Sequence, residues 1–275
     1  MAQQTNKVWF ITGASRGLGR IWTEAALERG DQVAATARSL SSITALNNKY
    51  GNQVLTLELD VNNPDQVKDA INNAHAHFGR LDIVLNNAGY PVISTIEEAK
   101  PEDIRALYET NVIGPVTVIQ AALPLLRKQG YGHILGTSSS LGHLSMPILG
   151  FYCSSKWAFE AIYESLAAEV AQFGINITII EPGAYATEFG MGEISNIFTG
   201  MDVYNDFKEK FMEGMKDMER GNPAATPQAI FKIVDAENPP LRFNLGSYNL
   251  PDLKAAYANR IATWEAWDAI SRSAQ

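Results

Sequence analysis

The chain has one cysteine, Cys153, in 275 residues, so it cannot form a disulfide bond within itself. A chain without an internal disulfide fits a reducing compartment. Basic residues are also in the minority. The 22 Lys and Arg stand against 30 Asp and Glu, which leaves a net charge of −8. Because the nucleic acid backbone attracts basic surfaces, this balance argues against nucleic acid as a partner.

Long hydrophobic runs are absent as well. No apolar stretch approaches the roughly 20 residues that a helix needs to cross a bilayer. The first seven residues lack the charged and apolar regions of a secretory signal. Internal repeats and low-complexity tracts are also missing. We therefore expect a cytoplasmic protein without membrane contact. The hydrophobic content of 46% suits a globular core.

Short apolar runs alternate with helical patterns along most of the chain. Predicted strands cover residues 8–11, 32–37, 53–58, 81–85, 133–137, 176–180 and 241–245. Predicted helices cover residues 20–29, 63–78, 102–128 with a bend near Pro124, 152–172, a stretch around Phe207, a stretch from Thr226, and 251–271. This alternation predicts an α/β fold. We expect a single doubly wound Rossmann-type domain over 1–275, with a parallel sheet of about seven strands and ligands at the strands' carboxyl ends.

A glycine-rich turn, residues 12–19, lies between the first strand and the first helix. Its glycines are Gly13, Gly17 and Gly19, and Gly30 ends the helix that follows. Glycines allow a tight turn and a close approach of the backbone, and the helix N-terminus offers free N–H groups to an anion. The pattern predicts a dinucleotide site. The alternative is an ordinary corner between a strand and a helix.

Tyr152 and Lys156 stand four residues apart, which places them on one face of a helix. A free tyrosine has a pKa near 10, and a neighbouring positive charge lowers it. The pair is therefore a candidate proton donor and acceptor. Three candidate serines, Ser138, Ser139 and Ser140, lie just upstream.

Residues 188–222 are rich in methionine and phenylalanine. The apolar side chains of this segment include Phe189, Met191, Ile194, Ile197, Phe198, Met201, Tyr204, Phe207, Phe211, Met212, Met215 and Met218. One interpretation is a lid over an apolar substrate. The alternative is an amphipathic helix that packs on the core. A C-terminal extension follows at about 239–275, where Trp264, Trp267 and Ile270 predict packing or an interface.

Taken in order, these motifs resemble those of the short-chain dehydrogenase/reductase family over residues 7–187. The resemblance rests on the glycine turn, the run Asn86–Gly89, Asn111, the serines, Tyr152 with Lys156, and Pro182 with Gly183. It implies hydride transfer between a nicotinamide cofactor and a carbonyl or secondary alcohol carbon. It implies no metal.

The resemblance also implies catalytic roles. Tyr152 would be the general acid in reduction and the base in oxidation. Lys156 would lower the pKa of Tyr152 and hold the nicotinamide ribose. Ser139 would orient the substrate oxygen, because Gly142 follows it by three residues and Tyr152 by thirteen. Asn111 would bend its helix and hold a water of a proton relay, or, alternatively, bond to nearby backbone.

The expected cofactor is NADP(H), with NAD(H) less favoured. Enzymes that use NAD usually carry an acid at the end of the second strand, where this chain has Arg38. Arg38 and Arg16 suit a 2′-phosphate. The full set of expected cofactor-binding residues is Gly13, Ser15, Arg16, Gly17, Leu18, Gly19, Arg38, Asp60, Val61, Asn87, Ala88, Gly89, Tyr152, Lys156, Pro182, Gly183 and Thr187.

The expected substrate is a fairly bulky, apolar ketone or secondary alcohol, in a pocket lined by Tyr90, Leu141, Leu149 and Phe189. Ser94 departs from the family pattern, since many relatives carry glycine five residues after Gly89. That departure leaves the shape of the loop at 90–95 open.

Two other functions compete with this one. An NADPH-binding regulator without turnover would tend to lose the tyrosine or the lysine, and both are present. A nucleotide-sugar epimerase would need a larger C-terminal domain. The resemblance implies a homodimer or homotetramer, in which helices 102–128 and 152–172 face copies of themselves.

Overall fold

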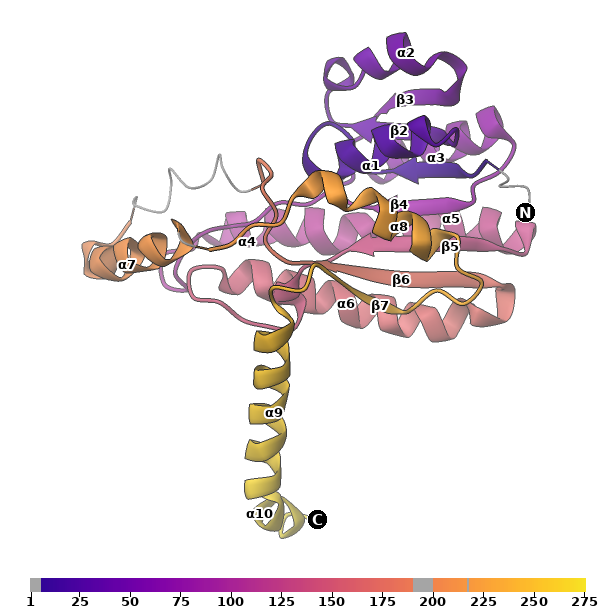
Figure 1. Cartoon of the computed structure of the whole chain (residues 1–275). Helices are drawn as coiled ribbons and strands as arrows, with labels where there is room; N and C mark the ends of the chain where they lie inside the picture. The colour runs from indigo at the N-terminus through magenta and orange to yellow at the C-terminus, as the bar shows by residue number, and fades with distance from the viewer. Residues whose placement is uncertain (1–5, 190–199, 217) are drawn as a thin grey trace.

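The computed structural model describes residues 6–189, 200–216 and 218–275 (Figure 1). The strands are β1 (Val8–Ile11), β2 (Gln32–Ala37), β3 (Val54–Glu58), β4 (Ile83–Asn86), β5 (Gly132–Thr137), β6 (Ile175–Pro182) and β7 (Arg242–Leu245). They form one sheet in the order β3-β2-β1-β4-β5-β6-β7, and every pairing is parallel. The predicted α/β fold is confirmed. The strand order reverses between β1 and β4, which is where such sheets bind ligands.

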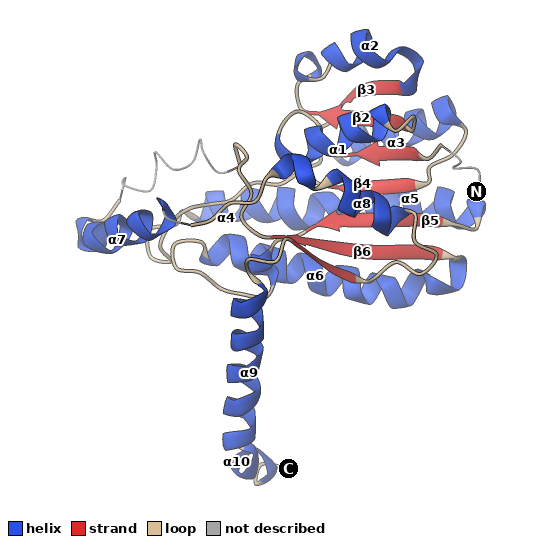
Figure 2. Cartoon of the chain, in the orientation of Figure 1, coloured by secondary structure: helices blue, strands red, loops and turns tan. Residues whose placement is uncertain are grey.

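Helices cover both faces of the sheet (Figure 2). The α-helices of the described residues are α1 (Gly17–Glu28), α2 (Ala45–Tyr50), α3 (Pro64–Phe78), α4 (Pro101–Tyr108), α5 (Gly114–Gln129), α6 (Gly150–Val170), α7 (Asn205–Lys216), α8 (Pro227–Val234), α9 (Leu250–Ala266) and α10 (Asp268–Arg272). The side chains of β1 alternate between the two faces of the sheet. Val8 and Phe10 pack with α3, α5 and α6, whereas Trp9 and Ile11 pack with α1, α2 and α8.

Most element boundaries agree with the sequence patterns within about two residues. Asn63 caps α3 as predicted, because its side-chain oxygen accepts from the backbone N–H groups of Asp65 and Gln66, each at 3.1 Å. Two differences lie in the first two crossovers, between β1 and β2 and between β2 and β3. The first helix begins at Gly17 rather than at residue 20, and the short helix α2 was not predicted.

The helix predicted over 102–128 is present over 101–129, but it is not a regular α-helix throughout. A π-helical turn, Glu109–Ile113, separates α4 from α5, and Asn111 lies in the middle of it. The helix continues through Pro124. The side chain of Asn111 bonds to the backbone of Tyr90 outside the helix. That bonding fits the association of π turns with functional positions.

The C-terminal helix α9 projects away from the sheet (Figure 1). It ends at Ala266, so the single helix predicted over 251–271 is divided at Trp267, and α10 follows. Trp264 is 68% exposed and Trp267 is 61% exposed. Packing within the chain therefore does not account for these side chains. Among the helices of the described residues, none combines the length and apolar character needed to span a membrane.

Candidate active site

A cavity of about 1050 Å³ lies at the carboxyl ends of the strands. Motifs that are far apart in the sequence meet in its wall, including the glycine turn, the Asn87 region, the serines and the start of α6. The predicted site residues that line it are Gly13, Ser15, Arg16, Gly17, Leu18, Arg38, Asp60, Val61, Asn87, Ala88, Gly89, Tyr90, Ser139, Leu141, Leu149, Tyr152, Lys156, Pro182, Gly183, Thr187 and Phe189. The predicted residues Gly19 and Asn111 do not line the cavity themselves. Gly19 lies against Asn87, and Asn111 lies against Gly89.

The glycine turn is braced by Asn87. The Asn87 amide nitrogen donates to the backbone oxygens of Thr12 at 3.1 Å and Gly13 at 3.2 Å. Gly13 has φ +72°, and a Cβ there would lie 3.0 Å from the Cα of Ala88. A Cβ at Gly19 would collide with Asn87 and with the Gly13 oxygen. The turn thus leaves bare backbone at the N-terminus of α1, a cradle that fits a dinucleotide pyrophosphate.

Lys156 and Tyr152 lie together on α6, as their spacing predicted. Both are almost fully buried, with 4% and 5% exposure. The Lys156 ammonium lies 5.8 Å from the centre of the Tyr152 ring and donates a hydrogen bond of 2.8 Å to the Thr137 backbone oxygen. Ser139 acts on Tyr152 as a hydrogen-bonding group that lowers its pKa. Two candidate proton-transfer groups and a hydroxyl therefore meet at one point of the cavity.

Burial controls the ionisation of this pair. It lowers the pKa of Lys156 to about 8, against the opposing charge of Glu160. It raises the pKa of Tyr152 above the ordinary value, and the hydrogen bond with Ser139 only partly opposes this. Burial outweighs the other effects on Tyr152, because moving a phenolate out of water is costly. The predicted lowering of the Tyr152 pKa by Lys156 stays a prediction.

The three serines have different surroundings. Ser138 is buried and donates to the Glu160 carboxylate. Ser139 acts on Tyr152 to lower its pKa, and its hydroxyl accepts a hydrogen bond from the Leu141 backbone N–H at 3.1 Å. Ser140 lines the cavity. Of the three, Ser139 has a contact with Tyr152, which suits the role predicted for it.

Asn111 is fully buried and bonds to the backbone of Tyr90 on both sides. Its oxygen accepts from the Tyr90 N–H at 3.1 Å, and its amide nitrogen donates to the Tyr90 oxygen at 2.9 Å and to Ser155 at 3.1 Å. A Cβ at Gly89 would lie 3.1 Å from the Asn111 oxygen and 3.7 Å from the Lys156 ammonium. The structure shows the backbone-bonding alternative, which fixes the chain beside Lys156. The water relay stays a prediction.

The residues that would contact the adenosine part of the cofactor also line the cavity. Arg38 follows β2 directly, and Arg38 and Arg16 are both exposed at the cavity edge. Asp60 accepts a hydrogen bond of 3.0 Å from the Asn62 backbone N–H, so it also serves its own turn. Thr187, which the family resemblance assigns to the nicotinamide carboxamide instead, also faces the glycine turn, since a Cβ at Gly17 would lie 4.0 Å from its Cβ.

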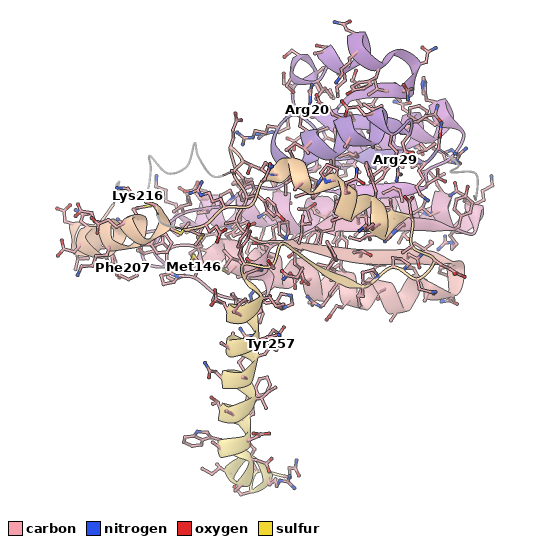
Figure 3. All side chains as sticks on the ribbon, in the orientation of Figure 1. Arg20, Arg29, Met146, Phe207, Lys216 and Tyr257 are labelled. Carbon is pink, nitrogen blue, oxygen red and sulfur yellow. The ribbon has the colours of Figure 1, made fainter. Side chains whose placement is uncertain are left out.

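Helix α7 supplies much of the apolar wall. Phe211, Met212, Met215 and, beyond the helix, Met218 line the cavity. Phe207 points elsewhere and is 47% exposed (Figure 3). This placement favours the lid interpretation over core packing for those residues. Met191, Ile194, Ile197 and Phe198 of the predicted lid lie outside the described residues.

The lid helix is anchored through Glu98. The Glu98 carboxylate pairs with the buried ammonium of Lys208 and accepts the Met201 backbone N–H at 2.6 Å. Nearby, the Ser94 backbone N–H donates to the Ile148 oxygen at 2.8 Å. The loop with the unusual serine is thus held against the loop before α6, where Ile148 has the strained φ of +66°.

Sequence patterns missed part of the wall. Met146, Tyr185, Tyr248, Asn249 and Asp252 also line the cavity. The last three belong to the turn before α9 and to its first turn, about a hundred residues after Tyr152 in the chain. No spacing rule connects them with the motifs, because the return of the chain beside β6 brings them there.

Comparison with known proteins supplies the family. Residues 7–196 match the family described as short chain dehydrogenase. The "Oxidoreductase BOA17" of Botryotinia fuckeliana is 41% identical over 244 residues, 87% of this chain and 89% of the relative. A 3-ketodihydrosphingosine reductase of Bacteroides thetaiotaomicron is 33% identical over 270 residues, 93% of this chain and 97% of the relative.

Solved structures agree with this match. A short-chain dehydrogenase from Streptomyces avermitilis has a TM-score of 0.90 at 33% identity and covers 99% of both chains. An alcohol dehydrogenase from Thermococcus sibiricus, complexed with 5-hydroxy-NADP, has a TM-score of 0.73 at 25% identity over 88% of this chain and 96% of that one. A Burkholderia phymatum relative in complex with NAD shares the fold at 20% identity, with a TM-score of 0.79 over 92% and 94%. The chain belongs to the short-chain dehydrogenase/reductase family of oxidoreductases.

Proposed function

We propose that this protein is an NADP(H)-dependent reductase of carbonyl compounds that also oxidises the corresponding secondary alcohols. One observation carries the proposal. The buried Tyr152 interacts with Ser139, which lowers the Tyr152 pKa, and lies on one helix face with Lys156, in a cavity that also contains the glycine turn. A hydroxyl pair at one end of a dinucleotide cradle suits a carbonyl oxygen placed for reduction.

The side chains divide the chemistry among them. When bound, the nicotinamide cofactor supplies the hydride. Ser139 and Tyr152 hydrogen-bond the substrate oxygen and orient the carbonyl carbon. Tyr152 is protonated at neutral pH because burial raises its pKa, so it gives its proton to the oxygen as negative charge develops there. Lys156, fixed by Thr137, stabilises the tyrosinate that remains and holds the ribose hydroxyls.

A preference for NADP(H) is supported by two arginines. Arg38 and Arg16 lie at the cavity edge where the second strand ends and the glycine turn begins. Both suit the charge-assisted bonds that a 2′-phosphate accepts, and no acid follows β2 to repel it. The complex of the Thermococcus relative with 5-hydroxy-NADP agrees with this preference, whereas the Burkholderia phymatum relative holds NAD.

A bulky, apolar ketone is the proposed substrate. The end of the cavity near Tyr152 is lined by Leu149, Met146 and Phe189, with the apolar face of α7 beside them. Phe189 lies 5.9 Å from Tyr152, measured between ring centres. Such a wall excludes water from the reacting carbonyl and accepts a large apolar group. The name of the Bacteroides relative, a keto-compound reductase, points the same way.

The test is a panel of ketones of increasing size, with NADPH and NADH absorbance as the readout, on the wild type and on Tyr152→Phe. We expect the wild type to reduce bulky ketones. The variant should lose turnover and keep NADPH binding, measured by calorimetry. Turnover retained in the variant would overturn the tyrosine mechanism. NADPH binding without turnover of any ketone by the wild type would favour the NADPH-binding regulator instead.

We also propose that the protein is a cytoplasmic homodimer or homotetramer. The single buried thiol of Cys153 suits a reducing compartment. The exposed side chains of Ile261, Trp264 and Trp267 on and after α9 support an interface in addition to the faces of α5 and α6. Light scattering on the wild type and on a Trp264→Glu, Trp267→Glu variant tests the interface, and an unchanged mass would exclude the α9 part of it.

A further inference from the structure

Behind the cavity lies a buried cluster of ionisable groups. His143, Glu160 and Glu181 are each at most 8% exposed, and their ligand-type atoms lie within 4.8 Å of one another. Two carboxylates and an imidazole are a combination that binds divalent metals. Here a nitrogen of Arg242 occupies the centre. It lies 2.6 Å from Glu160, 2.7 Å from Glu181 and 3.0 Å from His143. The guanidinium thus stands where a cation would bind.

Glu160 reaches forward from this cluster to the loop that carries Ser139. One carboxylate oxygen of Glu160 accepts the hydrogen bond of Ser138, while the other is held by Arg242. At the far end of the loop, Gly142 lies against the same carboxylate, because a Cβ there would overlap the Glu160 oxygen. One side chain therefore holds both ends of the turn in which Ser139 lies.

Glu160 also stands one helical turn after Lys156 on α6, so the two side chains share a face. Both groups are nearly fully buried, where charges interact strongly. The charge of Glu160 opposes the effect of burial on Lys156 and favours its ammonium form.

The other charged or titratable groups around Glu160 come from four elements and a loop. Arg242 of β7 and Glu181 of β6 flank it, and His143 comes from the loop before α6. Glu164 of α6 binds the outer side of Arg242 at 2.8 Å. On the far side, the Tyr257 hydroxyl of α9 bonds to His143 at 2.7 Å.

We propose that Glu160 is a positioning residue of the active site. Its carboxylate, held by Arg242, fixes the loop that carries Ser139 and places a negative charge one helical turn behind the Lys156 ammonium. The predicted effect of Glu160 on turnover rests on the proposed function. The predicted effect of Glu160 on the titration of Lys156 does not, because it can be measured without any substrate.

The charge part is tested with Glu160→Gln, which keeps an acceptor for Ser138 and removes the charge. The protein is labelled with ¹³C-lysine, and the Lys156 signal is assigned by its loss in Lys156→Met. We expect the titration midpoint of Lys156 to fall by about one pH unit. The matched control is Glu164→Gln, which removes an exposed partner of Arg242 on the same helix and should leave the midpoint unchanged. Equal midpoints in Glu160→Gln and the wild type would overturn this part.

The loop part is tested with Glu160→Asp, which keeps the charge but is one methylene too short to hold both Arg242 and Ser138. We expect kcat for ketone reduction to fall about tenfold, with the KM for NADPH within about twofold and the Lys156 midpoint near that of the wild type. A wild-type kcat in this variant would overturn the positioning role.

Two further results keep the tests separate. If Glu160→Gln does not fold, Ser138→Ala decides the proposal. It breaks only the bond from the loop to Glu160, and full activity there would overturn the proposal. If the wild type reduces no ketone, the proposed function fails while the lysine titration still reports on Glu160.

Discussion

The ammonium of Lys156 donates a hydrogen bond of 2.8 Å to the backbone oxygen of Thr137, the last residue of β5. This bond ties the face of α6 that carries Tyr152 and Lys156 to the carboxyl end of a central strand. The lysine is therefore held by the sheet. Since burial also lowers its pKa to about 8, the lysine loses its proton at mildly alkaline pH.

The first prediction concerns this titration. Reduction by the wild type should decline as the pH rises through about 8, because Lys156 is charged below its pKa and neutral above it. Lys156→Met, which fills a similar volume without charge, should lower kcat/KM by about a hundredfold and abolish the alkaline decline near pH 8. Rates between pH 6 and pH 10 with NADPH check this. A decline near pH 8 that survives in the variant would assign it to another group.

The second prediction concerns the cofactor. Arg38→Asp should raise the KM for NADPH by about tenfold or more, because a carboxylate repels the 2′-phosphate that the guanidinium would bind. The KM for NADH should stay level or fall. Arg127→Asp, which makes the same charge change at the exposed end of α5, is the control. Equal effects on the two cofactors would remove Arg38 from the phosphate site.

The third prediction concerns the lid. Lys208→Met removes the ion pair of the Glu98 carboxylate and so weakens the attachment of α7. We expect faster proteolysis near α7 and a several-fold higher KM for bulky ketones, with little change for small ones. Lys210→Met, an exposed position on the same helix, is the matched control. A uniform loss of activity for ketones of all sizes would contradict the lid interpretation.

The fourth prediction concerns stability in acid. Burial, with a smaller effect of Lys7, lowers the pKa of His133 to about 4. The unfolded chain binds this proton near pH 6.5, so stability is complete above that pH and falls as the pH drops toward 4, by about 3 kcal/mol in all. Urea unfolding at pH 7.5 and pH 4.5 measures the fall. In His133→Gln it should be smaller than in the exposed-site control His77→Gln, and equal falls would show that His133 is not responsible.

Local sequence patterns predicted much of the fold because strands, helix caps and turns are set by residues that are close together in the sequence. The apolar run Val8–Ile11, the cap at Asn63 and the glycine turn each act within a few residues. The same is true of the pair Tyr152 and Lys156, whose spacing alone places them on one helix face. The short helix α2 lacked such a signal.

Contacts between distant segments decided the rest. The π-helical turn at Asn111 depends on the backbone of Tyr90, twenty-one residues away. The direction of the Tyr152 pKa depends on how completely the folded chain removes the phenol from water. Neither the π-helical turn nor the direction of this pKa shift can be predicted from the spacing of residues along the chain.

The sequence by itself determined the parallel α/β fold, the order of the motifs and the helix face shared by Tyr152 and Lys156, since strand length, helix period and turn chemistry are properties of neighbouring residues. Only the tertiary structure decided that Ser138 donates to Glu160 whereas Ser139 interacts with Tyr152, and that Arg242 binds the other Glu160 oxygen. The physical reason is that a buried hydrogen bond or ion pair depends on which groups the fold brings within about 3 Å, and that distance has no relation to separation along the chain.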